Sequence, residues 1–541
     1  MEERIWHASY PPGLARDLVF GEHDTFVTLL EGAFARHAGR TAVTCNGESL
    51  TWAEIDHASA RLAAFLQAAG LQRGDRVALL LPNHLLYPVA LAAIARAGFV
   101  CVTMNPLYTP REAEYQLADS GATALLVADP FSPLVAEVID RTEVRHVITT
   151  PMRDVRTALL APPAERQARP RISDVHPVSL GSAIASVKQD DFIPAAIRPS
   201  DLAFLQYTGG TTGVSKGACL THRNVLVNLL QMQSWLRLNL DIEDFELVTP
   251  LPLYHIFPLA VALMALVTGG RNRLIMNPRD IKTLCAELHR PFDLLIGVNT
   301  MFNGMVNAPE LATADFSRCR MVIGAGASIQ AAVARKWEEA GGPPITEAYG
   351  LSETSPSVSF NPPGRNGAIG MPVPSTDVLI VDSLDQPVPL GTPGELLIKG
   401  PQVFAGYWKR DDETRKVFTA DGWFRTGDIV TMDAQGSMQI VDRKKDMILV
   451  SGFNVYPNEI EGVVATHPDV LECACVGVPD ERSGEVPHLF VVRRTAGLQE
   501  EQVEQHCRKL LAAYKVPRHI TFLEALPKST VGKILRKELR A

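Results

Sequence analysis

The chain has 541 residues, of which 46% are hydrophobic and 21% are charged, an ordinary composition for a globular protein with several cores. Its formal net charge of -8 argues against non-specific nucleic-acid binding as its main task. Residues 1–7 contain no apolar core, so we expect no signal peptide, and the longest clean apolar run, 257–267, is shorter than the ~18 residues that span a bilayer. We therefore expect a cytoplasmic protein, with peripheral contact at the inner face of the cell membrane left open.

Apolar strand-like runs alternate with helical patterns in the first third of the chain. Strands are expected at 76–81, 99–104 and 123–127, and helices at 87–97 and 111–119. The pattern returns with strands at 292–298 and 321–323 and a helix at 329–340. Such alternation is typical of βαβ crossovers, and it predicts an α/β protein with a parallel sheet.

The amino-acid composition and the predicted secondary structure change along the remaining chain. Residues 155–195 are rich in Pro, Ala and charge, and we interpret them as a surface excursion. Short strands with turns from Asp377 predict a small antiparallel region, and an α+β texture follows a charged run at Asp442. Domain boundaries lie in charged segments that few contacts cross, so we place a linker there and divide the chain into domains 1–441 and 442–541.

A glycine- and threonine-rich loop, YTGGTTGVSKG at 207–217, follows a strand expected at 202–207. Glycines let backbone N–H groups turn toward phosphate oxygens, threonine hydroxyls add donors, and Lys216 adds a compact positive charge. The spacing is not that of a Walker A loop, because Ser215 separates Gly213 from Lys216. An ordinary P-loop NTPase is therefore disfavoured, while a flexible surface loop would have the same composition.

Seven further motifs follow in order along the chain. They are LPLYH at 251–255, GAG at 324–326, YGLSET at 349–354, GWFRTGD at 422–428, DRKKD at 442–446, SGFNVYP at 451–457 and PKSTVGK at 527–533. With the glycine-rich loop, this series resembles the adenylate-forming superfamily of acyl-CoA synthetases, luciferases and peptide-synthetase adenylation domains, over nearly the whole chain. The sequence around the motifs, such as NPLYTPR at 105–111, is most similar to bacterial long-chain fatty acid–CoA ligases.

The resemblance implies a fold and a reaction. The fold is a large N-terminal domain of two α/β subdomains and a β-barrel-like subdomain, followed by a small mobile α+β domain hinged near Asp442. The reaction is ATP-dependent activation of a carboxylic acid as an acyl-adenylate, followed by transfer to coenzyme A. ATP, Mg²⁺ and coenzyme A are therefore the expected cofactor and co-substrates.

The resemblance also implies roles for individual residues. Lys533 would bridge the carboxylate and the α-phosphate, Glu353 would hold Mg²⁺, and His255 would line the channel where the thiol meets the acyl-adenylate. Tyr349 would stack on adenine, and Asp428 would hold the ribose with help from Arg443. The expected catalytic residues are Lys533, His255, Glu353 and Thr208. The expected binding residues are Thr208, Gly209, Gly210, Thr211, Thr212, Gly213, Lys216, Gly324, Ala325, Gly326, Tyr349, Gly350, Thr354, Asp428, Arg443 and Gly452.

Each of these residues also has a plain structural interpretation. Glu353 could be a surface or capping carboxylate, Tyr349 a packing residue, and Asp428 a turn residue. The basic tail from Pro527 could be a solvated segment. The eight cysteines are expected to be small buried hydrophobes, and the spacing of Cys473 and Cys475 is not a zinc pattern.

The expected substrate is an unbranched aliphatic acid of long or medium chain. Apolar residues follow His255 and occupy 292–302, whereas an amino-acid substrate would need an acidic partner for its ammonium. The alternatives are adenylation of an aryl or other acid, and transfer to a carrier protein. A non-catalytic lipid-binding scaffold would require loss of Lys533, Glu353 or the loop. The expected partners are a fatty acid, ATP and coenzyme A but no nucleic acid, and a homodimer is left open.

Overall fold

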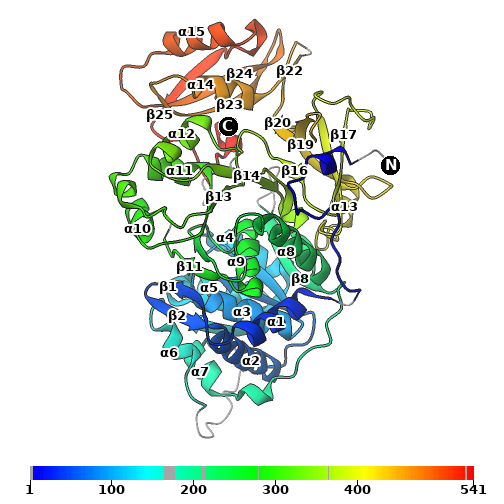
Figure 1. The fold of residues 1–541 in the computed structure, drawn as a ribbon, viewed down its shortest axis with the longest axis vertical. Coiled ribbons are helices and arrows are strands. Elements are labelled where there is room, and N and C mark those ends of the chain that lie inside the picture. Colours follow the sequence, from blue (N-terminus) through cyan, green and yellow to red (C-terminus); the bar gives the residue numbers. More distant parts are fainter. Residues whose placement is uncertain are drawn as a thin grey trace.

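The computed structural model describes residues 4–22, 24–163, 177–208, 215–277, 279–362, 365–451, 453–529 and 533–540. Two α/β layers and a smaller β region form the large part of the molecule, and residues from Ile448 onward form a separate unit at the top of Figure 1. This arrangement confirms the predicted α/β fold with a large N-terminal and a small C-terminal domain.

The first layer is a seven-stranded sheet with the order β7-β6-β5-β3-β4-β8-β9. Its pairs are parallel except for β8 and β9, which are antiparallel. The strands are β3 (Arg76–Leu80), β4 (Val100–Met104), β5 (Ala122–Ala128), β6 (His146–Thr150), β7 (Val178–Ser179), β8 (Leu202–Thr208) and β9 (Lys216–Thr221). Helices α3 (Leu86–Arg96) and α4 (Pro110–Ser120) are the crossovers that the sequence predicts.

The second layer is a nine-stranded sheet with the order β16-β15-β14-β13-β12-β10-β11-β1-β2. Its strands are β1 (Thr41–Cys45), β2 (Glu48–Thr51), β10 (Glu246–Thr249), β11 (Arg271–Leu274), β12 (Leu294–Gly297), β13 (Met321–Gly324), β14 (Ile345–Gly350), β15 (Ser357–Phe360) and β16 (Met371–Pro372). Helices α1 (Phe26–His37), α8 (His222–Leu236) and α9 (Ile256–Thr268) pack on one another between the two sheets (Figure 1). The apolar run 257–267 lies in α9, so it is a core helix, and no helix in the described part of the chain is long and apolar enough to span a membrane.

Several outer elements complete the two layers. Helix α2 (Trp52–Ala68) packs on α3, and α11 (Asn299–Val306) packs on α10 (Ile281–Glu287) and α12 (Ala331–Glu339). The predicted surface excursion is partly wrong, because its described residues include α6 (Val155–Leu159) and α7 (Leu180–Ala185). Leu159 and Leu180 are fully buried, so apolar residues anchor both short helices against the sheet despite the polar surroundings in sequence.

The predicted antiparallel region is a four-stranded sheet, and the C-terminal unit has a sheet of its own. The first consists of β17 (Asp377–Val381), β18 (Gly394–Lys399), β19 (Phe424–Met432) and β20 (Met438–Arg443), with α13 (Asp411–Val417) beside β19. The second has the order β22-β21-β24-β23 with β25 paired to β24. Its elements are β21 (Ile448–Val450), β22 (Phe453–Val455), α14 (Pro457–Val464), β23 (Val470–Asp480), β24 (Gly484–Arg493), α15 (Glu500–Leu510), β25 (His519–Leu523) and α16 (Arg536–Leu539).

The change of sheet occurs between Arg443 and Ile448. Asp442 is therefore the last but one residue of β20, and the connecting turn follows it. The C-terminal unit has its own hydrophobic clusters, which contain no residue before Ile448. All eight cysteines are free, and seven are buried as the sequence predicts, among them Cys473 and Cys475 in this core, whereas Cys319 is half-buried.

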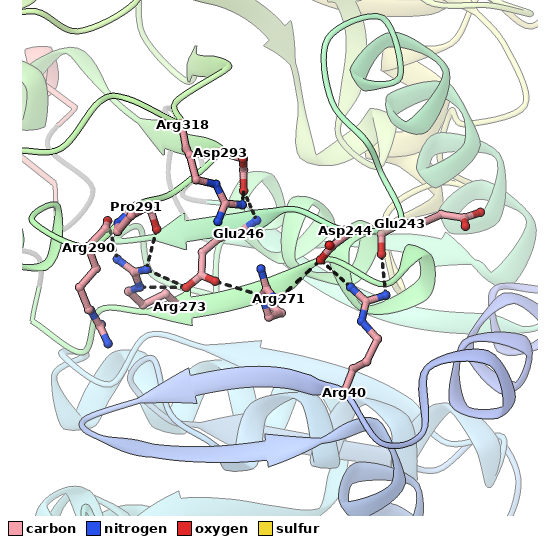
Figure 2. Close-up of polar contacts among 10 residues, drawn as sticks. All are labelled: Arg40, Glu243, Asp244, Glu246, Arg271, Arg273, Arg290, Pro291, Asp293 and Arg318. Carbon is pink, nitrogen blue, oxygen red and sulfur yellow. Dashed lines mark hydrogen bonds and ion pairs between the residues drawn. The ribbon is translucent and has the colours of Figure 1, made fainter.

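An ionic ladder ties together the N-terminal ends of β10 and β11 (Figure 2). Glu246 accepts hydrogen bonds from Arg271 at 3.1 Å and from Arg273 at 2.7 Å. The guanidinium of Arg273, 5% exposed, also donates to the carbonyl oxygens of Glu287 at 2.7 Å and Pro291 at 3.1 Å. Arg273 thus fixes the C-terminal end of α10 against the sheet, at the strand ends opposite to those that carry the motifs.

Candidate functional site

A cleft of about 1950 Å³ is lined by residues of both the large part and the C-terminal unit. Thr208, Tyr349 and Gly350 lie at the ends of β8 and β14, and Asp428 and Arg443 come from β19 and β20. The predicted site residues that line the cleft are Thr208, Lys216, His255, Ala325, Gly326, Tyr349, Gly350, Glu353, Asp428, Arg443 and Lys533. Gly209, Gly210, Thr211, Thr212, Gly213 and Gly452 lie outside the described residues.

Lys533 reaches the cleft from the C-terminal unit. Its Cε lies beside Gly326, where an added Cβ would stand 3.6 Å away, and Gly326 adopts a φ of +79°. The Ser529 amide donates a hydrogen bond to the Lys533 carbonyl oxygen at 2.7 Å. Lys533 lines the cleft and stays exposed to solvent, while the cleft walls remove part of its water. This desolvation, and then the charge of Arg443, lower the pKa of Lys533 to about 8.

Asp428 is the centre of a polar group that lines the cleft. Its carboxylate accepts a bond from the Tyr349 hydroxyl at 2.5 Å and pairs with Arg443 Nε at 3.1 Å. Asp428 and Arg443 are register partners on β19 and β20, which places both side chains on one face of that sheet. Burial and the Asp428 charge raise the pKa of Tyr349 well above its usual value, so this hydroxyl stays a donor.

Glu353 lies in the cleft with little exposure, 9%. The Tyr407 hydroxyl donates to its carboxylate at 2.7 Å, and burial raises the pKa of Glu353. A buried carboxylate with one neutral donor has unused acceptor capacity. No cluster of three or more His, Cys, Asp or Glu side chains suited to a metal occurs in the described residues. One carboxylate fits Mg²⁺, which takes few protein ligands when nucleotide phosphates and waters supply the others.

Lys216 is held at the start of β9. Its ammonium pairs with Glu413 of α13 at 2.5 Å and lies 5.2 Å from the Tyr407 ring centroid. Thr208 and Lys216 face each other across β8 and β9, and the Ser215 hydroxyl donates to the Thr208 carbonyl at 2.5 Å. Ladder pairing thereby fixes the two residues that flank the predicted phosphate loop.

His255 is the N-cap residue of α9 and lies beside Tyr254, with ring centroids 4.8 Å apart. Burial, with the nearby charge of Lys533, lowers the pKa of His255 to about 3. The imidazole is therefore neutral at physiological pH and too weak a base to remove a proton efficiently. This favours the positioning role in the channel over a role as general base.

Three further predicted residues belong to the chain segments that form the cleft: Gly324, Gly350 and Thr354. A Cβ on Gly350 would lie 1.9 Å from the Pro356 carbonyl oxygen, so only glycine fits this turn. Gly324 ends β13 and Thr354 is fully buried, and neither lines the cleft. The Thr354 hydroxyl lies within 3.0 Å of the Leu351 carbonyl, so it closes the turn that presents Glu353.

The cleft also has an apolar arm. Met232 and Leu236 lie one turn apart on α8, and together with Val261 of α9 they line this arm. Phe360 of β15 is buried and stacks on Trp235, with ring centroids 5.9 Å apart. None of these positions belongs to a motif, and their only sequence signal is the ordinary spacing of a buried helix face.

Sequence reasoning missed three polar residues of the site. Tyr407 orients Glu353, Glu413 holds Lys216, and Arg536 anchors the segment that carries Lys533. The solvated-tail interpretation is wrong for Arg536, which is only 17% exposed and pairs with Glu461. Lys528 and Arg540 stay exposed to solvent but pair with Glu472 and Asp446. Their carboxylate partners lie far away in the sequence, so spacing could not reveal them.

Comparison with known proteins agrees with this geometry. Residues 30–408 match the AMP-binding enzyme family, and residues 459–533 match the C-terminal domain of AMP-binding enzymes. The chain belongs to the AMP-binding enzyme family. It is 46% identical over 550 residues to a long-chain-fatty-acid--CoA ligase of Yersinia pestis, covering 99% of this chain and 98% of that protein.

Solved structures of the family share the whole fold. The anthranilate CoA ligase AuaEII, in complex with anthranoyl-AMP, superimposes with a TM-score of 0.85 at 25% identity, over 96% of this chain and 97% of that one. ATP-bound MatB from Rhodopseudomonas palustris gives a TM-score of 0.82 at 30% identity, over 95% of this chain and 98% of that one. An enzyme of this family uses ATP and Mg²⁺ with a carboxylic acid and coenzyme A.

Proposed function

We propose that this chain is an AMP-forming fatty acid–CoA ligase that acts on long- or medium-chain aliphatic acids. The observation that carries the proposal is the cleft itself, which combines Lys533, Asp428 and Glu353 with an apolar arm. The 46% identity to a long-chain-fatty-acid--CoA ligase over nearly the full chain supports the choice of substrate.

In the first half-reaction, a carboxylate oxygen of the acid attacks the α-phosphorus of ATP. The bond from that phosphorus to the bridging oxygen breaks, and pyrophosphate leaves with the bonding electrons. Lys533 stabilises the negative charge that gathers between the two reactants, since a preorganised cation in a site with little water interacts strongly. Asp428 and Arg443 orient the ribose, and Tyr349 provides a face for adenine.

Mg²⁺ would be held by Glu353 together with phosphate oxygens of ATP, and it would neutralise phosphate charge. Tyr407 keeps the Glu353 carboxylate directed into the cleft. Lys216, with the loop that precedes it, would contribute positive charge toward the leaving pyrophosphate.

In the second half-reaction, the thiol sulfur of coenzyme A attacks the acyl carbon. The bond between that carbon and the adenylate oxygen breaks, AMP leaves with the electron pair, and the thiol proton passes to solvent. We infer that the C-terminal unit turns about residues 442–447 between the two halves, so that Lys533 withdraws and Gly452 approaches the pantetheine arm.

The test measures pyrophosphate release with ATP, Mg²⁺ and acids from C4 to C18 plus benzoate, with and without coenzyme A. We expect turnover that depends on coenzyme A and is greatest for a long aliphatic acid. A burst that coenzyme A cannot turn over would mean that a carrier protein is the acceptor. Greater activity with benzoate would favour the aryl acid alternative, to which the similarity to an anthranilate CoA ligase points.

We further infer peripheral membrane contact and a homodimer. A long-chain acid partitions into lipid, so an enzyme that collects it there gains access to its substrate. Flotation with phosphatidylglycerol vesicles and sedimentation equilibrium test these two proposals. Protein that stays in the dense fraction would reject membrane contact. Protein that sediments as a monomer would reject the homodimer.

A further inference from the structure

A cluster of buried and half-buried charges lies where the Lys533 segment meets the connecting turn. Arg536 is its centre, three residues after Lys533. One terminal nitrogen of Arg536 lies 2.8 Å from each carboxylate oxygen of Glu461 and 2.7 Å from the Asn458 side-chain oxygen. Its other terminal nitrogen lies 3.5 Å from Asp442 and 3.5 Å from Asp446.

The partners of Arg536 belong to three different parts of the chain. Glu461 and Asn458 are on α14 of the C-terminal unit, Asp446 is in the connecting turn, and Asp442 is on β20 of the large part. Asp442 is fully buried and accepts bonds from the amides of Asn458 at 2.9 Å and Arg443 at 2.7 Å. The contact between Arg536 and Asp442 therefore crosses the predicted hinge.

We propose that Arg536 is a positioning residue for the first half-reaction, because it fixes the C-terminal unit to β20 in the orientation that keeps Lys533 in the cleft. This inference rests on the proposed function. Its bonds to Glu461 lie within the C-terminal unit and move with it, whereas its contact with Asp442 must break when the unit turns. Arg536 thus acts on the reaction through Lys533 and the hinge, without touching the reactants.

The charges around the cluster explain why the side chain at 536 matters. Asp442, Asp446 and Glu461 place three carboxylates around one guanidinium, and Arg540 pairs with Asp446 at 2.9 Å. Without Arg536, the like charges of Asp442 and Glu461 would repel each other across the hinge. A planar guanidinium can contact several carboxylates at once, whereas a lysine ammonium is a compact point charge.

The kinetic test compares Arg536→Met with Arg536→Lys and with Arg508→Met as a matched control. Arg508 is in an exposed ion pair with Glu504 on α15, in the same unit. We expect Arg536→Met to slow acyl-adenylate formation by about 10-fold or more, since a small misplacement of a catalytic group has a large effect on rate. For Arg536→Met, the rate of thioester formation from supplied acyl-adenylate should change by less than about 3-fold. For Arg536→Lys, the rate of acyl-adenylate formation should lie between those of the wild type and Arg536→Met.

A second measurement needs no substrate, so it separates this inference from the proposed function. Arg443, Lys444 and Lys445 are exposed in and beside the connecting turn, and trypsin cleaves after them. We expect faster cleavage at these positions in Arg536→Met than in the wild type and Arg508→Met. Unchanged cleavage, or equal loss in both half-reactions, would overturn the proposal. If Arg536→Met fails to fold by circular dichroism, the same two criteria are applied to Arg536→Lys.

Discussion

Lys533 is the side chain on which acyl-adenylate formation depends most directly. It comes from the last residues of the chain and reaches Gly326 of the large part. A cation placed in this way can assist acyl-adenylate formation only while the C-terminal unit holds it in the cleft. The two half-reactions should therefore respond differently to its loss.

We expect Lys533→Ala to slow acyl-adenylate formation by roughly 10²-fold or more, by analogy with the loss of one preorganised electrostatic group. Transfer of supplied acyl-adenylate to coenzyme A should be largely kept, because Lys533 acts before that step. Pyrophosphate exchange and a thioester assay measure the two halves separately. Equal loss in both would contradict the role given to Lys533.

The pH dependence of the first half-reaction follows from the depressed pKa of Lys533, about 8 in the free protein. The protonated amine is the active form, so kcat/KM for ATP should fall as pH rises through this value. Arg443 lowers this pKa, and Asp428 and Glu353 raise it. A profile of kcat/KM from pH 6 to 10 measures the effect, with thioester formation from supplied acyl-adenylate as the control that should not fall. A flat profile for the first half would refute the assignment.

At the scale of elements, α8 and α9 build the apolar arm, and the strand ends hold the polar groups. Met232 lies on the face of α8 that lines the cleft, whereas Leu230 on the same helix does not line it. The length of the acyl chain that fits therefore depends on side-chain volume along one helix face.

We expect Met232→Phe to shift the preference toward shorter acids, because added volume in a packed arm costs about 1–3 kcal/mol for chains that must reach past it. The ratio of kcat/KM for C16 to that for C8 should fall about 10-fold. Leu230→Phe, a similar increase in size on the same helix, is the control. An unchanged ratio in Met232→Phe would place the acyl chain elsewhere.

At the scale of the whole molecule, site residues and a stabilising ion-pair network lie at opposite ends of the strands in the nine-stranded sheet. Three of the motifs, at 251–255, 324–326 and 349–354, lie at the carboxyl ends of its strands β10, β13 and β14, as ligand sites of α/β sheets do. The ionic ladder of Figure 2 lies at the other ends, and there Arg273 joins the sheet to α10.

We expect Arg273→Met to lower the free energy of unfolding by about 2–4 kcal/mol, because it leaves Glu246 short of a partner and buried carbonyls without donors. Thermal denaturation followed by circular dichroism should show a lower Tm. Arg290→Met is the control, since its ion pair with Glu287 is exposed and should contribute about 0.5 kcal/mol or less. Equal changes in Tm would show that burial of Arg273 is unimportant.

The sequence by itself determined the α/β class and several strands and helices of the two layers, and its motifs, through the family resemblance, predicted part of the site. Apolar periodicity depends only on neighbouring residues, so β3, α3, β4, α4 and β5 were predicted nearly to their ends. The motifs likewise identified Tyr349, Glu353, Asp428 and Lys533, because each occurs in a short pattern whose residues act together. The short helices α6 and α7 were missed, since their periodicity is too brief to stand out.

Only the tertiary structure decided how those residues are supported. Tyr407 reaches Glu353 from another segment, Glu413 pairs with Lys216, and Arg536 contacts Asp442 across the hinge. The lowered pKa values of His255 and Lys533 depend on desolvation and on neighbouring charges, which the packing of two units creates. Contacts between residues distant in sequence leave no local pattern, and desolvation is a property of the assembled cleft.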